Sequence, residues 1–282
     1  MDQVINLFTP HVGEQIFQHL SDQQLFFNCL KVSETWKVLA KNVILARWKN
    51  HFNNACRYGL AEVVKILLEF SEPYNICVTK PNVFGQTPLI LACENGHVDV
   101  VNILLEYSDS KTTYLNAKDF SDQTALHYAC LFGHTDIVKI ILENAVSKQI
   151  DVNTKDIDGW TPLITAAHLG KADIIQLILG YSEPLNVNLN TKDRMGFTAL
   201  MSACIKGHVD VVKVLLNHSV SRKLDVTMVN HNGETAMSIA CLEGHIDIVK
   251  LLLNQQTKSF NKATQTDHLK SKTQNRAKRR KR

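Results

Sequence analysis

The most informative absences in this sequence of 282 residues concern membrane segments and export signals. No stretch approaches the roughly 18 uninterrupted apolar residues that a membrane-spanning helix needs, so we expect no membrane partner. The first twenty residues lack the basic start and apolar run of a secretory signal. We therefore expect an intracellular, soluble protein.

Motifs that carry catalysis or hold cofactors are missing as well. The chain has no glycine-rich phosphate loop, no Cys-x-x-Cys pair of the kind that binds zinc, and no nucleophile elbow. Its polar residues recur at a regular spacing and do not converge on one pocket. We therefore expect neither enzymatic activity nor a cofactor.

What the sequence has instead is a repeat of 37 residues. A threonine opens a similar apolar phrase in five units, and a glycine follows nine residues later: Thr87, Thr124, Thr161, Thr198 and Thr235, with Gly96, Gly133, Gly170, Gly207 and Gly244. A fixed period of this size indicates one small structural unit stacked on itself. The chain should therefore be a solenoid, and solenoids usually work by binding a partner.

Each unit carries the start and stop signals of a helix pair. The threonine hydroxyl is a good helix cap, and Pro88 and Pro162 fit the first helical position, which needs no amide hydrogen. The glycine can take the left-handed conformation that ends a helix. A second helix follows, with apolar residues at helical spacing, as in residues 100–105.

The repeated phrase resembles the ankyrin repeat, in which a turn with glycine precedes Thr-Pro-Leu-His, two small residues and Gly-His. Residues 156–179 are a clear copy, with Thr161-Pro162-Leu163, Ala166-Ala167 and Gly170. The resemblance implies an all-α solenoid of helix–turn–helix repeats with β-turn fingers. The usual ankyrin period is 33, so we expect about four extra residues in a loop after each second helix.

A sixth unit without the Thr-Pro-Leu opening precedes the other five in the same phase, with Ala55-Cys56 and Gly59 at the equivalent places. A degenerate end repeat is expected, because one of its faces has no neighbour. The expected boundaries are 1–44 for an N-terminal helical segment, 45–81 for the degenerate first repeat, 82–118, 119–155, 156–192, 193–229 and 230–254 for the other repeats, and 255–282 for a tail.

Cysteines and histidines recur once per unit. Cys56, Cys93, Cys130, Cys204 and Cys241 share one position, with Ala167 at the sixth, while His97, His134, His208 and His245 follow the glycine. Stacked helices lie about 8–10 Å apart, too far for disulfides. We interpret the cysteines as small buried side chains. Histidines one layer apart cannot converge on a metal ion, so we expect them to form structural hydrogen bonds.

Residues 1–44 do not follow the repeat, and their pattern predicts three short amphipathic helices. The segment resembles the F-box, although Thr9 stands where that family commonly has leucine. The resemblance implies docking to a Skp-type adaptor, and through it to a cullin ligase core, by Pro10, Ile16, Phe17, Leu20, Leu25, Val32 and Trp36. The alternative is a helical cap on the solenoid, and one segment could do both.

The tail differs from the rest of the chain in charge. Residues 255–282 contain ten Lys or Arg residues and one acid, Asp267, which gives +9; the formal total of +4 leaves −5 for the rest. The composition predicts disorder. A compact basic cluster suggests nuclear import, on Arg276, Lys278, Arg279, Arg280, Lys281 and Arg282. The alternative is a solvated tail that no partner recognises. The lack of aromatic residues between the basic ones argues against nucleic-acid binding.

In the ankyrin family, binding residues usually flank the turn glycine or lie seven and eight positions after the threonine. The resemblance therefore implies that an unknown client binds Phe120, Leu131, Phe132, Ile157, Trp160, His168, Leu169, Arg194, Met195, Phe197 and Lys206. Large apolar side chains at normally exposed positions are typical of an interaction patch. A competing interpretation is that some of them, Phe132 and Leu169 especially, are buried by the next repeat or its long loop.

Two functional hypotheses remain open from the sequence. In the first, the chain is the substrate-recognition subunit of a Skp/cullin/F-box ubiquitin ligase, and the repeats bind the client. In the second, it is a scaffold or inhibitor without a ligase. Both predict a protein of the nucleus, the cytoplasm or both.

Overall fold

The computed structural model describes residues 51–71, 77, 79–107, 115–217, 224–255 and 257. By its internal contacts the chain divides into two compact units, Met1–Ile157 and Asp158–Arg282. The segment 1–44 that resembles an F-box, and nearly all of the basic tail, lie outside the described residues.

The described part of the first unit consists of helix pairs. These are α5 (Phe52–Arg57) with α6 (Ala61–Glu69), α7 (Pro88–Glu94) with α8 (Val98–Tyr107), and α9 (Ala125–Phe132) with α10 (Thr135–Ala145). α5 packs against α7, and α7 packs against α9. The degenerate first repeat therefore has the same helix pair as its neighbours.

The second unit repeats this plan. Its pairs are α11 (Pro162–His168) with α12 (Ala172–Gly180), α14 (Ala199–Lys206) with α15 (Val209–Asn217), and α17 (Ala236–Leu242) with a helix that includes residues 246–255; the short helix α13 (Ser182–Leu185) follows α12. α11 packs against α14, and α14 against α17.

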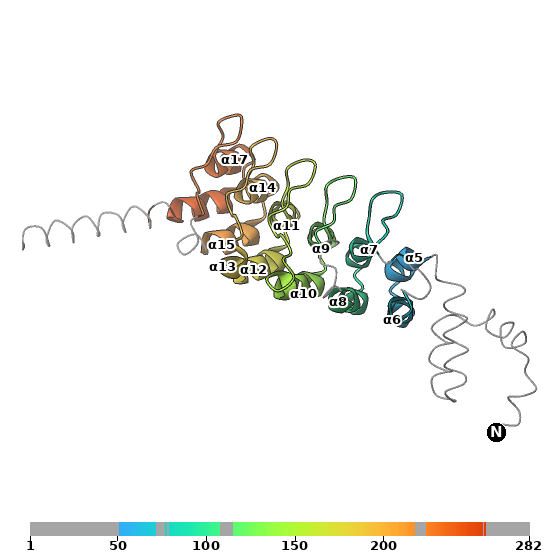
Figure 1. The fold of residues 1–282 in the computed structure, drawn as a ribbon. Coiled ribbons are helices and arrows are strands. Elements are labelled where there is room, and N and C mark those ends of the chain that lie inside the picture. The colour runs from blue at the N-terminus through green and yellow to red at the C-terminus, as the bar shows by residue number, and fades with distance from the viewer. Residues whose placement is uncertain are drawn as a thin grey trace, which may run out of the picture. The chain divides into compact units, whose positions relative to one another are not determined.

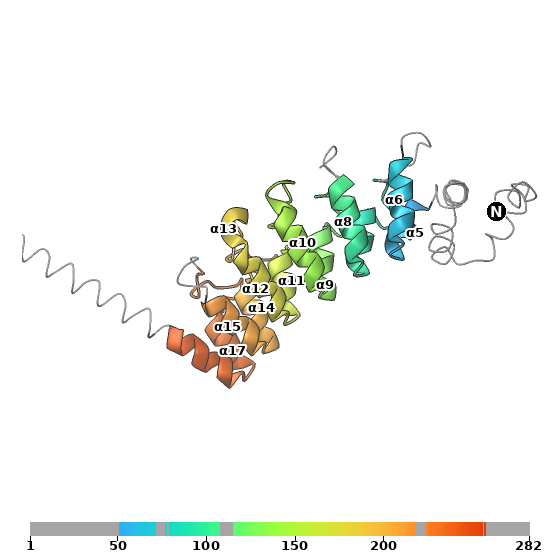
Figure 2. The same cartoon turned by 90° about the horizontal axis from the view of Figure 1, so that it is seen from below.

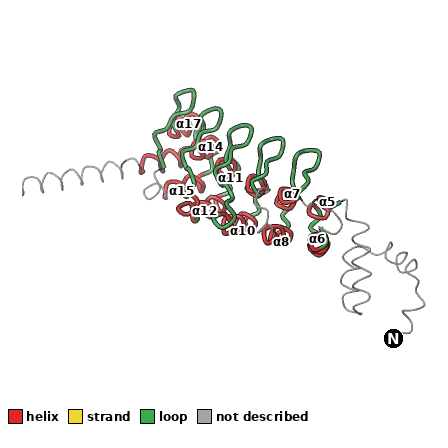
Figure 3. Tube along the Cα trace, viewed as in Figure 1, coloured by secondary structure: helices red, strands yellow, loops and turns green. Residues whose placement is uncertain are grey.

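Within each unit, the first helices of the pairs form one layer and the second helices form another (Figures 1 and 2). The loops that join successive pairs project beyond the layer of first helices as fingers (Figure 3). No β-strand occurs in the described ranges; a single antiparallel bridge joins Val229 to Thr235. None of the described helices is both long enough and apolar enough to span a membrane.

The repeated threonines begin the first helices, as the sequence predicts. Thr87 Oγ1 accepts a hydrogen bond from the backbone N–H of Ile90, and Thr161, Thr198 and Thr235 make the same bond three residues on. Pro88 and Pro162 occupy the first helical positions. At α9 the ring of His127 takes part, because its Nδ1 accepts the backbone N–H of Thr124.

Four of the described repeats are tied to the one before them by a histidine. Nε2 of His97 lies 2.8 Å from the carbonyl oxygen of Arg57, and His134, His208 and His245 reach the carbonyls of Glu94, His168 and Ile205. Because a carbonyl oxygen only accepts, the imidazole N–H donates in each pair. The structural role predicted for these histidines is confirmed.

The glycine before each histidine ends a helix and makes room for the next repeat. Gly96 has φ +76°, in the left-handed region. A Cβ atom on Gly96 would lie 2.7 Å from Cε1 of His134, closer than such atoms approach. Glycine is therefore required here for two reasons: the left-handed backbone conformation and the close approach of the His134 ring.

The core of each unit lies between the two helix layers. Cys56, Cys93, Cys130 and Cys204 are free thiols buried at one repeated position, and burial raises the pKa of the Cys204 thiol to about 12. The predicted burial is wrong for Cys241, which is exposed. Its position faces the following repeat, and no described residue covers that face of the last one.

The extra residues after the second helices are not all irregular. After α12 they form α13, in which Ser182 Oγ donates to the carbonyl of Leu179, and Asn186 in the left-handed conformation ends the turn. A loop was expected there. This helix could not be predicted from the sequence, because four residues are too few to show a helical period.

Candidate client-binding surface

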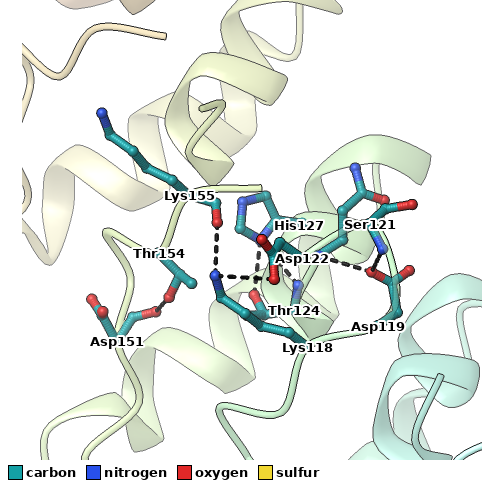
Figure 4. Close-up of polar contacts among 10 residues, drawn as sticks. Lys118, Asp119, Ser121, Asp122, Thr124, His127, Asp151, Thr154 and Lys155 are labelled. Atoms are coloured by element: carbon teal, nitrogen blue, oxygen red, sulfur yellow. Dashed lines mark hydrogen bonds and ion pairs between the residues drawn. The ribbon is translucent and has the colours of Figure 1, made fainter. Parts of the chain in front are cut away.

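In four of the fingers, one side chain holds a tight turn. In the finger 119–123, Oδ1 of Asp119 accepts the backbone N–H groups of Ser121 (2.9 Å) and Gln123 (2.8 Å); the first of these contacts is seen in Figure 4. Asn82, Asp193 and Asn230 bond in the same way in their own fingers. A turn with its polar groups satisfied locally is rigid, so the residues at its tip are held in place.

Neighbouring fingers of one unit are also bonded to each other. In the first unit, the backbone N–H of Phe120 donates to the carbonyl of Phe84 at 3.2 Å. Lys118 Nζ donates to the carbonyl of Lys155 at 2.9 Å and lies 3.7 Å from Oδ1 of Asp122 (Figure 4). In the second unit, Arg194 N–H donates to the Asp158 carbonyl. The spacing between tips is therefore fixed by the fold.

Large apolar side chains stand at the finger tips of the first unit. Val83 is 82% exposed, Phe84 63%, Phe120 77% and Ile157 46%. We call these four residues the finger surface. Phe120 and Ile157 were predicted from the sequence, whereas Val83 and Phe84 were missed, although Val83 stands one repeat before Phe120 in the register.

The ring of Phe120 lies directly against the neighbouring finger. A Cβ atom on Gly85 would come within 2.7 Å of its Cδ1. Glycine at 85 therefore leaves space for the ring, which lies against the preceding finger and is mostly exposed. An exposed aromatic ring that is already held in place loses little entropy on binding.

Beside the fingers of the first unit, a polar cluster lines the first helices. Tyr128 OH donates to Oδ2 of Asp119 at 2.7 Å and lies 3.1 Å from Nε2 of Gln86. Burial of Tyr128, together with this bond to Asp119, raises the pKa of Tyr128 to about 12. Phe132 stacks on Tyr128 with ring centroids 6.3 Å apart. The cluster fixes a second aromatic side chain, Phe132, near the fingers.

In the second unit, the equivalent positions carry a mixed surface. The rings of Trp160 and His168 are 4.6 Å apart. Burial lowers the pKa of His168, and its electrostatic interactions with Lys206 and His208 lower it further. Met195 is exposed at the next finger tip, beside the exposed Arg194. This surface therefore combines an aromatic pair, a thioether and cations.

The predicted client-binding residues differ in their accessibility. The first unit holds Phe120, Leu131, Phe132 and Ile157, and the second holds the rest. Leu131, Trp160, His168 and Phe197 are half-buried, whereas the exposed residues are Phe120, Phe132, Ile157, Leu169, Arg194, Met195 and Lys206. Phe132 and Leu169 are 49% and 37% exposed, so neither is fully buried by the described neighbours.

Two groups of predicted site residues fall outside the described residues. They are the adaptor-binding set from Pro10 to Trp36 and the basic cluster from Arg276 to Arg282. Within the described ranges, no group of three or more His, Cys, Asp and Glu residues is placed to hold a metal ion.

Comparison with protein families gives a direct match to this architecture. A family model for ankyrin repeats in three copies matches residues 52–156 and 144–226, and a second ankyrin model matches residues 200–253. The chain belongs to the ankyrin-repeat family. Ankyrin repeats are protein-interaction modules, and the family match indicates the same general role for this ankyrin chain.

A solved structure shares the fold. The ankyrin repeat domain of Bcl-3, described as a unique member of the IkappaB protein family, aligns with a TM-score of 0.64 and 24% identity, over 72% of this chain and 85% of that one. At this identity the likeness establishes the fold alone. No curated protein matches this ankyrin chain in sequence.

Proposed function

We propose that this ankyrin protein is a non-catalytic module that captures a client protein on the finger surface and the adjoining first helices. The observation that carries the proposal is the row of exposed apolar tips in the first unit, with Phe120 at 77% exposure. Phenylalanine side chains that are mostly exposed contribute little to the folded core and lower the solubility of the protein. Their accessibility is explained by a partner that covers them.

The energetics favour the tips as binding anchors. Burying a phenylalanine side chain contributes about 1.5–3 kcal/mol. Because the finger backbones are already bonded to each other, the entropy cost of ordering the loops offsets little of this burial free energy. Two phenylalanines are therefore enough to change client affinity by more than tenfold.

The proposal is tested by affinity purification with quantitative mass spectrometry. The variant Phe84→Ala/Phe120→Ala is compared with Val146→Ala, an exposed apolar residue after α10 that lies outside the fingers. We expect the double variant to lose a specific set of proteins that the control retains, with the melting temperature of both near that of the parent. If the two variants retain the same proteins, the finger surface is not the client site.

We further propose that residues 1–44 dock a Skp-type adaptor, which would make the protein the substrate-recognition subunit of a cullin ubiquitin ligase. The support is the F-box resemblance of these residues. The test replaces Pro10 and Trp36 together by Ala and measures binding of the purified adaptor. We expect binding by the parent and none by the variant, with the repeats folded in both.

The second candidate function is a scaffold or inhibitor without a ligase. It is supported by the likeness to the ankyrin repeat domain of Bcl-3, which is a member of the IkappaB protein family. A folded parent protein that does not bind the adaptor at micromolar concentration would decide for this second function.

For localisation we propose nuclear import through the basic residues 276–282. Replacing Arg279, Arg280 and Lys281 by Ala is expected to move a fluorescent fusion from the nucleus to the cytoplasm. An unchanged distribution would show that the cluster has no import role.

A further inference from the structure

The finger that carries Phe120 is tied to its own first helix by a tyrosine hydroxyl. Oδ1 of Asp119 holds the turn, and its other oxygen, Oδ2, accepts the hydroxyl proton of Tyr128 in α9 at 2.7 Å. Burial and this bond raise the pKa of Tyr128 to about 12, so the hydroxyl remains a donor at neutral pH. Hydrogen bonds to a carboxylate are about twice as strong as those between neutral groups. The turn is therefore fixed to α9 as well as within itself.

The same hydroxyl also reaches the finger that carries Phe84. Nε2 of Gln86 donates to the Tyr128 oxygen at 3.1 Å, and the same nitrogen lies 3.3 Å from Oε2 of Glu94 in α7. Gln86 is buried, so these contacts are shielded from water. One phenol oxygen therefore accepts from one finger and donates to the next, and it bridges the turns that hold the two phenylalanines.

Tyrosine stands at this position in one repeat only. In the other repeats that open with threonine, the equivalent residues are Leu91, Thr165, Ser202 and Ile239. The hydroxyl of Thr165 donates to a carbonyl of its own helix cap and not to a finger. The exposed phenylalanines of the finger surface therefore coincide with a bridge that the repeat pattern itself does not supply.

We propose that Tyr128 is a positioning residue of the client site, and that its hydroxyl holds the fingers of Phe84 and Phe120 in one fixed relation. The assignment to a client site rests on the proposed function, whereas the bridge is a property of the unbound protein. Apparent affinity is reduced by the fraction of molecules whose site is not in the binding arrangement. Loss of the hydroxyl should therefore weaken client binding without removing any apolar surface.

The variant Tyr128→Phe separates the hydroxyl from the ring. It keeps the stack on Phe132, whose ring centroid lies 6.3 Å away, and removes only the oxygen. The matched control is Tyr107→Phe in α8. Tyr107 is also half-buried, and its hydroxyl lies 3.0 Å from Oγ of Ser71, beside the second helices. Both variants keep every side chain of the finger surface.

Hydrogen exchange of the unbound protein measures the bridge directly. The backbone N–H of Phe120 donates to the carbonyl of Phe84 across the two fingers, and that of Gln123 donates to Asp119. We expect both amides to exchange at least about tenfold faster in Tyr128→Phe than in the parent, and at the parent's rate in the control. The amides of α9 and the melting temperature should stay near those of the parent. Unchanged exchange at both finger amides would overturn the proposal.

Client capture then tests the consequence for binding. The proteins that Phe84→Ala/Phe120→Ala loses define the client set, and Tyr128→Phe should retain at least about threefold less of them, whereas Tyr107→Phe retains them in full. Faster exchange with full retention would overturn the positioning role. If the double phenylalanine variant loses no protein, the proposed function fails, and the exchange rates still decide whether Tyr128 bridges the fingers.

Discussion

At the scale of the residue, the fold depends on a few positions where only glycine fits. The clearest example is the glycine that contacts the histidine of the next repeat. The imidazole crosses to a carbonyl in the previous repeat, and the glycine there both turns the chain and makes room for the ring. Lys171 stands at the equivalent position of the fourth repeat, so the histidine is not required in every layer.

Two glycines of the second unit make a matched test of this contact. Gly170 has φ +71° and lies 2.8 Å, measured from an added Cβ, from the ring of His208, whereas Gly180 in α12 has nothing within 4 Å. We expect Gly170→Ala to lower the free energy of unfolding by about 2 kcal/mol or more. Gly180→Ala should leave it unchanged or raise it by up to about 1 kcal/mol. Urea denaturation measures both, and equal effects would contradict the account.

The pKa of His168 gives a prediction in pH. Burial disfavours the protonated ring, so a titration followed by NMR should give a pKa below the ordinary value of about 6.5. The unfolded chain then binds more protons, so the contribution of His168 to stability is complete above about pH 6.5 and falls as the pH drops below that. Lys206→Ala should raise this pKa. An unshifted pKa in the parent would show that the ring is solvated.

At the scale of the element, the starts and ends of the first helices can be predicted from residues that are recognisable in the sequence. Threonine caps, prolines at the first helical position and left-handed glycines fixed the helix starts and ends that the sequence predicts. What could not be predicted depends on neighbours in space. The partial burial of Trp160 and His168, the helix α13 and the exposed Cys241 depend on what packs beside them, and the sequence alone does not show which residues become neighbours in space.

The cap of α14 can be tested by separating the hydroxyl from the methyl of its threonine. Thr198 is buried, and its Oγ1 lies 3.3 Å from the N–H of Met201. Thr198→Val keeps the shape and removes the acceptor, so it should cost about 1 kcal/mol of stability. Thr198→Ser keeps the acceptor and should cost less. If serine is the more destabilising replacement in thermal denaturation, packing and not capping explains the threonine.

At the scale of the whole molecule, each unit consists of a rigid double layer of helices that carries bonded fingers. The layers bury the apolar repeats, and the fingers carry the side chains that vary from repeat to repeat. In the first unit, Phe84 and Phe120 stand at finger tips where most of the side chain is exposed. Their size and exposure support the client site proposed on the finger surface.

Site-specific photo-crosslinking in cells tests this assignment most directly. A photoreactive phenylalanine analogue is placed at position 120 of the full-length protein, or at position 146 as an exposed control. We predict that position 120 gives a discrete crosslink to a client protein, which is lost when Phe84 is also replaced by Ala, and that position 146 gives none. Crosslinks from position 146 but not from 120, or the same products from both, would contradict the account.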